Sequence, residues 1–126
     1  YIDAKNASEI NVIFDMPVTV MRANRKVHAD AGRIAIMRGP VVYCAEGVDN
    51  GSDLCGFYID LNSEFTLGTD DFLLPRIQCD AYVQPESDLL YMPDTEDLIS
   101  VPLSLIPYYA FANRGDSDMI VWFLKK

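Results

Sequence analysis

Short stretches of alternating apolar and polar residues, closed by glycine, proline or asparagine, constrain the fold of this sequence most strongly. Residues 10–16 and 77–83 place apolar side chains at every second position, and residues 41–45 and 119–124 are almost uninterrupted apolar runs. Alternation is typical of strands that bury one face, and short apolar runs are typical of strands that bury both. The pattern therefore predicts a protein built of strands.

No segment sustains a helical period of 3.6 over ten residues with a cap at its start. Short strands separated by turn signals predict the all-β class, as an antiparallel β-sandwich or jelly-roll-like architecture with little or no helix. The 126 residues fit a single domain, residues 1–126. Strands are expected at residues 10–16, 18–20, 27–30, 33–37, 41–45, 57–61, 65–67, 77–83, 98–112 and 119–124.

The charge is strongly acidic and unevenly placed. The net charge is −9, and residues 46–97 hold 13 of the 19 acidic residues with a single basic residue, Arg76. Such a field disfavours nucleic acid and anionic membranes as partners. A solvated acidic face is the favoured interpretation, with a cation or a basic partner as alternatives. Residues 85–97 read as a long acidic connection, in which Leu89-Leu90-Tyr91 is a candidate apolar anchor.

Three cysteines, Cys44, Cys55 and Cys79, have spacings that fit no zinc-binding pattern. Cys44 lies in an apolar strand, where a small buried hydrophobe is expected. An odd number of cysteines favours a reducing compartment, and the choice between bacterial cytoplasm and periplasm stays open. The chain starts at Tyr1 rather than methionine, which predicts a segment excised from a longer protein.

Candidate catalytic and metal-binding residues are few. His28 is the single histidine, and a half-exposed strand position explains it better than a metal or general-base role. The turn at residues 49–53 offers oxygens at calcium-like spacing but lacks the other ligands of an EF-hand loop, and Asp70-Asp71 is weaker still. The acids cluster in turns, where the buried pair of a glycosidase is not expected. We therefore predict no catalytic residue, no metal ligand and no cofactor in this chain.

Aromatic side chains near the end of the chain are the remaining candidates for ligand contact. Strand alternation would place Tyr109 and Phe111 on one face and Tyr108 on the other. Aromatic residues in all-β domains are mostly core, but exposed rings can stack on sugars. The candidate sugar-contact residues are Tyr108, Tyr109 and Trp122.

Two segments distinguish this chain from other all-β sequences. They are Arg38-Gly39-Pro40-Val41-Val42-Tyr43-Cys44-Ala45-Glu46 and Ile106-Pro107-Tyr108-Tyr109-Ala110-Phe111-Ala112-Asn113-Arg114-Gly115. Shorter matching stretches are Asp15-Met16-Pro17-Val18, Gly32-Arg33-Ile34-Ala35, Gly47-Val48-Asp49-Asn50, Met119, Val121 and Trp122. With these residues the chain resembles the C-terminal part of glycoside hydrolase family 127, the β-L-arabinofuranosidase-like enzymes. The resemblance covers nearly the whole chain and is weakest in the acidic middle.

The resemblance implies a catalytic (α/α) barrel followed by β-sandwich domains. It also implies retaining hydrolysis of a β-L-arabinofuranoside with a cysteine nucleophile, a glutamate acid/base and a cysteine-rich zinc site. Those groups belong to the barrel, upstream of this chain, so no catalytic or zinc role passes to Cys44, Cys55, Cys79 or Glu46. Residues 1–20 resemble the tail of the preceding sandwich domain.

We therefore predict a noncatalytic accessory domain of a glycoside hydrolase. Its expected partners are the catalytic barrel of the parent chain and a second copy in a homodimer. The alternatives are a carbohydrate-binding module and an Ig-like interaction domain unrelated to any hydrolase. Apolar surface left exposed outside the parent protein would favour self-association.

Overall fold

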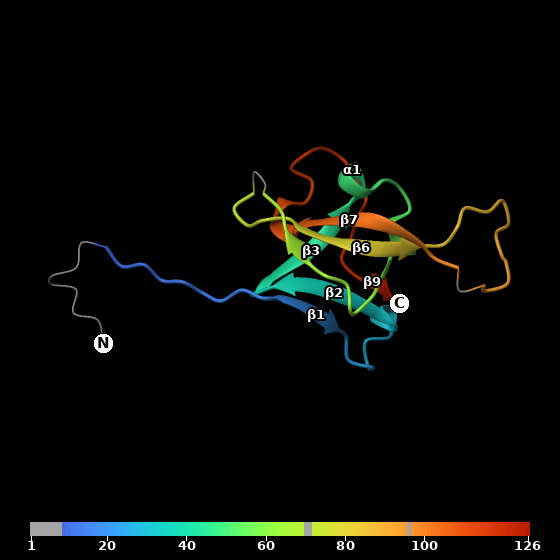
Figure 1. Cartoon of the computed structure of the whole chain (residues 1–126), viewed down its shortest axis with the longest axis horizontal. Helices are drawn as coiled ribbons and strands as arrows, with labels where there is room; N and C mark the ends of the chain where they lie inside the picture. Colours follow the sequence, from blue (N-terminus) through green and yellow to red (C-terminus); the bar gives the residue numbers. More distant parts are fainter. Residues whose placement is uncertain (1–8, 70–71, 96) are drawn as a thin grey trace.

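The computed structural model describes residues 9–69, 72–95 and 97–126 and shows strands with little helix (Figure 1). The strands are β1 (Val18–Arg22), β2 (Arg33–Arg38), β3 (Val41–Glu46), β4 (Tyr58–Ile59), β5 (Thr66–Leu67), β6 (Ile77–Val83), β7 (Ile99–Pro107), β8 (Met119–Ile120) and β9 (Phe123–Lys125). The helical elements are α1 (Gly47–Asn50) and three 3₁₀ turns, η1 (His28–Asp30), η2 (Leu54–Gly56) and η3 (Tyr108–Ala110). The predicted all-β class is confirmed.

Six strands close into a barrel. The pairings run β2-β9-β4-β6-β7-β3, and β3 returns to β2 through Met37 opposite Val42. β3 makes this closure because it pairs with β2 at its start, with β7 in its middle and with β8 at its end. The predicted sandwich or jelly-roll layering is therefore replaced by a closed ring. Alternation reports which face of a strand is buried and not which strands pair, so it could not distinguish the two architectures.

The core lies inside the ring, and β3 is buried on both faces, as its apolar sequence predicted. Tyr43 and Ala45 belong to the main core, whereas Cys44 packs with Ile106 and Ala110 in a second cluster. The fully or almost fully buried apolar side chains of the main core are Ile34, Ile36, Tyr43, Ala45, Leu54, Phe57, Ile59, Ile77, Cys79, Ala81, Leu103, Leu105 and Phe123.

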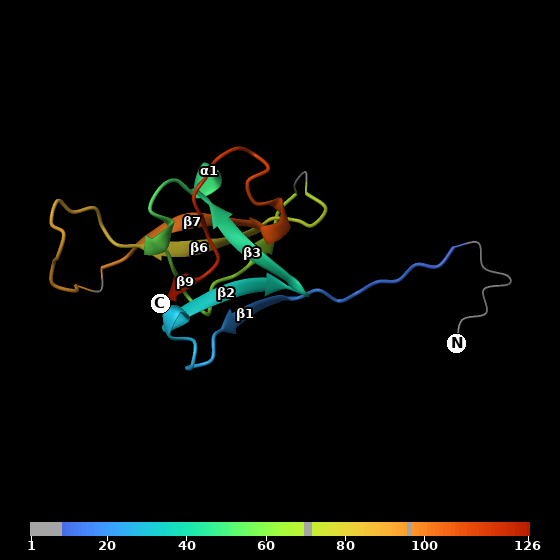
Figure 2. The same ribbon diagram turned by 180° about the vertical axis from the view of Figure 1, so that it is seen from behind.

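The predicted strand at residues 10–16 is wrong for this chain. The first strand begins at Val18, and the preceding segment extends away from the barrel with Ile13 93 % and Phe14 77 % exposed (Figures 1 and 2). A strand requires a partner edge, and no pairing of residues 10–16 occurs among the described residues. The alternation is real, but its partner is not in the described part of the chain.

Five other predicted strands are shorter, divided or replaced by a turn. The strand expected at residues 57–61 is limited to Tyr58–Ile59, and that expected at residues 65–67 is limited to Thr66–Leu67. Residues 27–30 form the turn η1 instead of a strand. The strand expected at residues 98–112 ends at Pro107, where η3 begins, and that expected at residues 119–124 is divided into β8 and β9. At residues 119–124 the pairing partner changes, because β8 pairs with β3 whereas β9 pairs with β2 and β4.

The long acidic connection leaves the barrel between β6 and β7, at the end opposite the N-terminal segment (Figures 1 and 2). The candidate anchor does not pack on the barrel, since Leu89 is 64 % exposed and Leu90 and Tyr91 are each 93 % exposed. No helix among the described residues is long and apolar enough to cross a membrane.

Candidate functional site: a buried glutamate and its arginine partners

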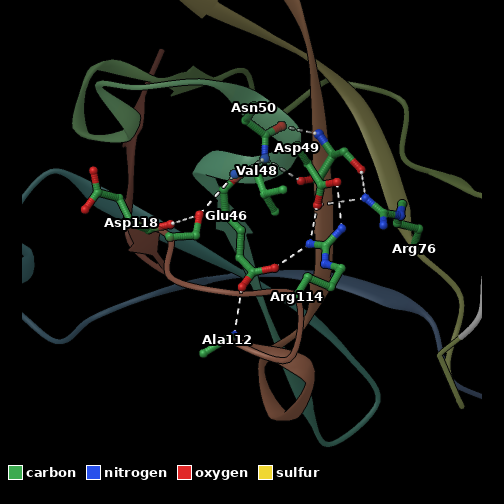
Figure 3. A network of polar contacts seen from close by, with 10 residues as sticks. Glu46, Val48, Asp49, Asn50, Arg76, Ala112, Arg114 and Asp118 are labelled. Carbon is green, nitrogen blue, oxygen red and sulfur yellow. Dashed lines mark hydrogen bonds and ion pairs between the residues drawn. The ribbon is translucent and has the colours of Figure 1, made fainter.

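The most connected polar cluster of the domain forms where β3 passes into α1 (Figure 3). Glu46 is the last residue of β3 and is 1 % exposed. The first turn of α1 is held by the segment before β8, because the Gly47 amide donates to the Asp118 carbonyl at 2.9 Å and the Val48 amide donates to Ser117 Oγ at 3.0 Å. These contacts place the residues of α1 over the barrel.

Asn50 ties α1 to β7. Its Nδ2 donates to the carbonyl oxygens of Glu46 and Ser104, each at 2.9 Å, and its Oδ1 accepts from the Ser104 amide at 2.8 Å. The amide side chain thus replaces a strand partner for Ser104, which keeps buried backbone groups hydrogen-bonded.

Both carboxylate oxygens of Glu46 accept hydrogen bonds from within the protein. One carboxylate oxygen accepts from the Ala112 amide at 2.8 Å, and the other accepts from Arg114 Nη2. The same guanidinium donates to both oxygens of Asp49, at 2.8 and 2.6 Å, which is bidentate pairing. Arg114 therefore stands between the two carboxylates and binds both of them (Figure 3).

Arg76, the residue directly before β6, completes the cluster. Its Nη1 lies 2.9 Å from Asp49 Oδ2 and donates to Ser104 Oγ at 3.0 Å. The guanidinium carbons of Arg76 and Arg114 each lie 5.6 Å from the centroid of the Phe72 ring, which is within cation–π range. Two acids, two bases and one ring form a compact unit with no formal net charge.

Mutual hydrogen bonds favour the charged forms of Asp49 and Arg114. The hydrogen bond from Arg114, aided by Arg76, holds the pKa of Asp49 below its ordinary value, although burial acts in the opposite direction. The hydrogen bond to Asp49, with a further one to Glu46, raises the pKa of Arg114. Neither Asp49 nor Arg114 is therefore suited to exchange a proton near neutral pH. These properties indicate a structural rather than a catalytic role for the cluster.

The oxygens of the turn at residues 49–53 do not converge on a common point where a calcium ion could bind. Asp49 faces the two arginines, and the oxygen of Asn50 accepts from β7. Among the described residues, no group of three or more histidine, cysteine, aspartate or glutamate side chains is close enough to hold a metal ion. His28 is exposed within η1, and Asp70-Asp71 lie outside the described residues.

The three thiols are free, and two of them are buried. Burial, followed by the negative charge of Glu46, raises the pKa of Cys44 to about 12. Burial, followed by the charge of Asp80, raises the pKa of Cys79 to about 12. Both thiols therefore stay protonated near neutral pH, and a protonated thiol is a poor nucleophile. Cys55 is exposed.

We expect iodoacetamide at pH 8 to label one cysteine per native chain and three per chain unfolded in urea. The native label belongs on Cys55, because thiolate is the reacting form and Cys44 and Cys79 are both buried and protonated. Peptide mass spectrometry locates the label, and the Cys55→Ser chain serves as the control that takes none. Native labelling of Cys44 at the rate of Cys55 would contradict the assignment.

The candidate sugar-contact residues lie on two different elements. Tyr108 and Tyr109, on η3, are 49 % and 51 % exposed, whereas Trp122 is partly buried between β8 and β9. The expected alternation is wrong, because the ring of Tyr108 stacks on Phe111 at a centroid distance of 6.4 Å. In a 3₁₀ turn, side chains three residues apart share a side. Tyr109 accepts a hydrogen bond from the Leu74 amide at 3.1 Å.

Sequence reasoning missed the partnership of Glu46 and Arg114. The two residues are 68 positions apart, so no local pattern links them. One signal was present: a glutamate that closes an apolar strand requires a buried donor. Arg76, the single base in an acidic stretch, was a second signal.

Comparisons with known proteins agree with one another. The family described as "Glycoside hydrolase family 127 C-terminal domain" matches residues 18–124. A non-reducing end β-L-arabinofuranosidase of Bifidobacterium longum subsp. longum is 34 % identical over 134 residues, covering 96 % of this chain and 20 % of that enzyme. The chain therefore spans about a fifth of the length of this curated relative.

Solved structures show the same fold. A GH127 β-L-arabinofuranosidase from Geobacillus stearothermophilus T6 superposes with a TM-score of 0.82 at 38 % identity, over 88 % of this chain and 18 % of that one. A second GH127 β-arabinofuranosidase superposes with a TM-score of 0.73 at 37 % identity, over 90 % of this chain and 18 % of its own.

Proposed function

Because this chain belongs to glycoside hydrolase family 127, as its C-terminal domain, we propose that it is a noncatalytic support of a β-L-arabinofuranosidase-like enzyme. The chemistry would lie in the remaining part of the longer polypeptide, together with any zinc that the enzyme requires. This domain would hold that part in place and contribute to a homodimer.

One observation carries the noncatalytic role. A retaining glycosidase needs a carboxyl acid/base and a nucleophile, which is a second carboxylate about 5–5.5 Å away in most families and a cysteine in the scheme that the resemblance implies. Glu46 and Asp49 are instead bridged by the guanidinium of Arg114, which fills the space between them and neutralises both. The buried thiols Cys44 and Cys79 are protonated, so neither supplies a nucleophile.

The N-terminal segment supports attachment to a larger body. Ile10, Val12, Ile13 and Phe14 are 53 %, 66 %, 93 % and 77 % exposed, although their alternation is that of a strand. The Nε atom of Arg38, at the end of the barrel where this segment leaves, is buried without a hydrogen-bond partner among the described residues. We propose that residues 9–17 pair with the sheet of the preceding domain, whereas residues 18–20 of the predicted tail belong to β1 of this barrel.

The kinetics of the longer natural enzyme test this role. We expect Glu46→Gln, Asp53→Asn and Cys55→Ser each to leave kcat/KM for an aryl β-L-arabinofuranoside within about twofold of the parent, at temperatures where the protein is folded. Loss of a general acid or base typically costs about 10²–10⁴-fold. A loss of that size in any of the three variants, with the fold intact by circular dichroism, would place chemistry in this domain.

A carbohydrate-binding role is the second candidate, because half of the Tyr108 and Tyr109 surfaces is exposed. An exposed aromatic ring can stack on a sugar. Calorimetry with arabinose-containing oligosaccharides separates the two roles, since binding that is lost in Tyr108→Ala would favour the binding module. The third alternative, an Ig-like domain unrelated to a hydrolase, is excluded by the family match.

A further inference from the structure

One partly buried cation of the domain has no partner. The Nε atom of Arg38 is buried and makes no hydrogen bond, and its side chain forms no ion pair, within the part of the chain that the structure describes. Folded proteins rarely leave a buried donor unpaired, because the lost hydrogen bond to water is then not replaced. The arginines of the buried cluster show the usual outcome, since Asp49 binds both Arg76 and Arg114. Arg38 therefore requires an acceptor that residues 9–69, 72–95 and 97–126 do not supply.

Arg38 lies where the N-terminal segment joins the barrel. It is the last residue of β2 and lies opposite Val18, the first residue of β1. The next residue, Gly39, holds the end of the segment, because its amide donates to the Pro17 carbonyl at 3.2 Å. A Cβ atom on Gly39 would lie 2.9 Å from Met16 Cε, so glycine leaves room for the methionine side chain. The polypeptide that enters the barrel at Val18 therefore passes beside Arg38.

The tyrosines of η3 lie at this same end of the barrel. Val41, the first residue of β3, lies opposite Arg38, and two positions further along β3 Tyr43 lies opposite Pro107. Because Pro107 is the last residue of β7 and η3 follows it directly, η3 lies beside the start of β3. The long acidic connection leaves at the opposite end (Figures 1 and 2).

Exposed apolar side chains accompany Arg38 at this end. Tyr108 and Tyr109 are half exposed, and Leu73 is 91 % exposed. Leu73 is close to η3 because the amide of the next residue donates to Tyr109 Oη at 3.1 Å. Ile13 and Phe14 of the N-terminal segment are exposed as well. An apolar surface around one unpaired cation is typical of an interface whose centre is shielded from water.

We propose that this end of the barrel docks on the preceding part of the longer polypeptide, and that a carboxylate of that part binds Arg38. The chain matches a C-terminal domain and covers 20 % of its curated relative, and the preceding polypeptide enters at this end, so the docking partner is tethered beside its binding surface. Docking removes water from the guanidinium, and a desolvated cation is stabilised by a paired anion. The inference rests on the proposed support role and names the contact through which the support acts.

Cleavage by chymotrypsin, which cuts after exposed aromatic residues, measures the docking. Phe14 is exposed here, so the 126-residue chain should be cut rapidly after Phe14, whereas the full-length natural protein should be protected. In the full-length protein, Arg38→Met should raise the rate of this cleavage at least about tenfold, because the rate follows the population of undocked molecules. Cleavage after Tyr91, in the connection at the opposite end, is the internal reference and should keep its rate. Mass spectrometry of the fragments assigns each cut.

Matched variants separate docking from other effects. Arg25→Met makes the same chemical change at an exposed residue beyond the far end of β1, and it should alter neither rate. Arg38→Lys keeps the charge and should protect Phe14 better than Arg38→Gln, which keeps a donor without the charge. In the 126-residue chain, Arg38→Met should not lower the urea midpoint of unfolding, because Arg38 has no partner to lose among the described residues.

Each of four results would overturn the proposal. They are rapid cleavage after Phe14 in the parent full-length protein, an unchanged rate in its Arg38→Met variant, equal protection by Arg38→Lys and Arg38→Gln, and a lower urea midpoint for Arg38→Met in the 126-residue chain. The last result would assign Arg38 to the stability of the barrel itself. The noncatalytic role is judged separately, by the kinetics of Glu46→Gln, Asp53→Asn and Cys55→Ser, so the two proposals can fail independently.

Discussion

Arg114→Ala is expected to lower the free energy of unfolding of this chain by about 2–4 kcal/mol. The substitution leaves the carboxylate of Glu46, 1 % exposed, with the Ala112 amide as its remaining donor among the described residues, and it removes the bidentate partner of Asp49. A buried charge without its counter-ion is costly because water cannot replace the lost donor. The Arg114 side chain is itself 28 % exposed, which places the expectation below the range for a fully buried pair.

Urea titration measures the loss, and Lys26→Ala, at an exposed residue, is the control that should change stability by less than about 0.5 kcal/mol. The double variant Glu46→Ala with Arg114→Ala should lose less free energy of unfolding than the sum of the two single losses. It removes both charges, so neither is left buried without its partner. Additive losses would show that the two side chains do not act as a unit.

The pH dependence of the free energy of unfolding provides a second test of the Arg114–Asp49 pair. The pKa of Asp49 is lowered from 3.8 in the folded chain, so its contribution is present above that value and is lost as the pH falls through the lower folded pKa. In Arg114→Ala this pKa should return toward 3.8. The free energy of unfolding of the variant should therefore fall less steeply than that of the parent chain between about pH 5 and pH 2. Equal slopes would contradict the pairing.

Phe123→Ala is expected to lower the free energy of unfolding of this domain by about 3–5 kcal/mol. Phe123 is fully buried in the main core and lies on β9, which joins β2 to β4 in the closed ring. Removing the ring leaves a cavity that neighbouring side chains on several strands border, and a closed barrel relaxes little around such a void.

Phe14→Ala is the matched control, since it removes the same side chain from a position that is 77 % exposed. We expect it to change the free energy of unfolding of this chain by less than about 0.5 kcal/mol. Thermal and urea unfolding of the two variants, side by side, measure the contrast. A comparable loss in Phe14→Ala would show that the N-terminal segment packs on the barrel, contrary to the structure.

Much of the fold could be predicted from local patterns. The alternation of residues 77–83 predicted β6 with its observed bounds, and the apolar run at residues 41–45 predicted a strand buried on both faces. The same alternation at residues 10–16 predicted a strand that this chain does not form. The three patterns differ in whether a partner edge is available, and that is a property of the folded molecule rather than of the segment.

The candidate site could be predicted only in fragments. Asp49 and Asn50 were singled out for their oxygens, but the partners of those oxygens are Arg114, Arg76 and Ser104. The tyrosines were placed by strand alternation, which failed because the chain turns at Pro107. Spacing within one segment carries no information about a donor that arrives from another strand.

By itself, the amino-acid sequence determined the all-β class, the strand at residues 77–83 and the acidic character of the connection at residues 85–97, because these follow from side-chain periodicity and composition. The tertiary structure alone decided that six strands close into a barrel and that Arg114 neutralises Glu46. Both depend on residues that lie far apart in the chain, such as Arg33 and Trp122, 89 positions from each other. Such contacts form only after the strands have paired, because pairing brings distant residues close together. Burial then strengthens the electrostatic interaction between them.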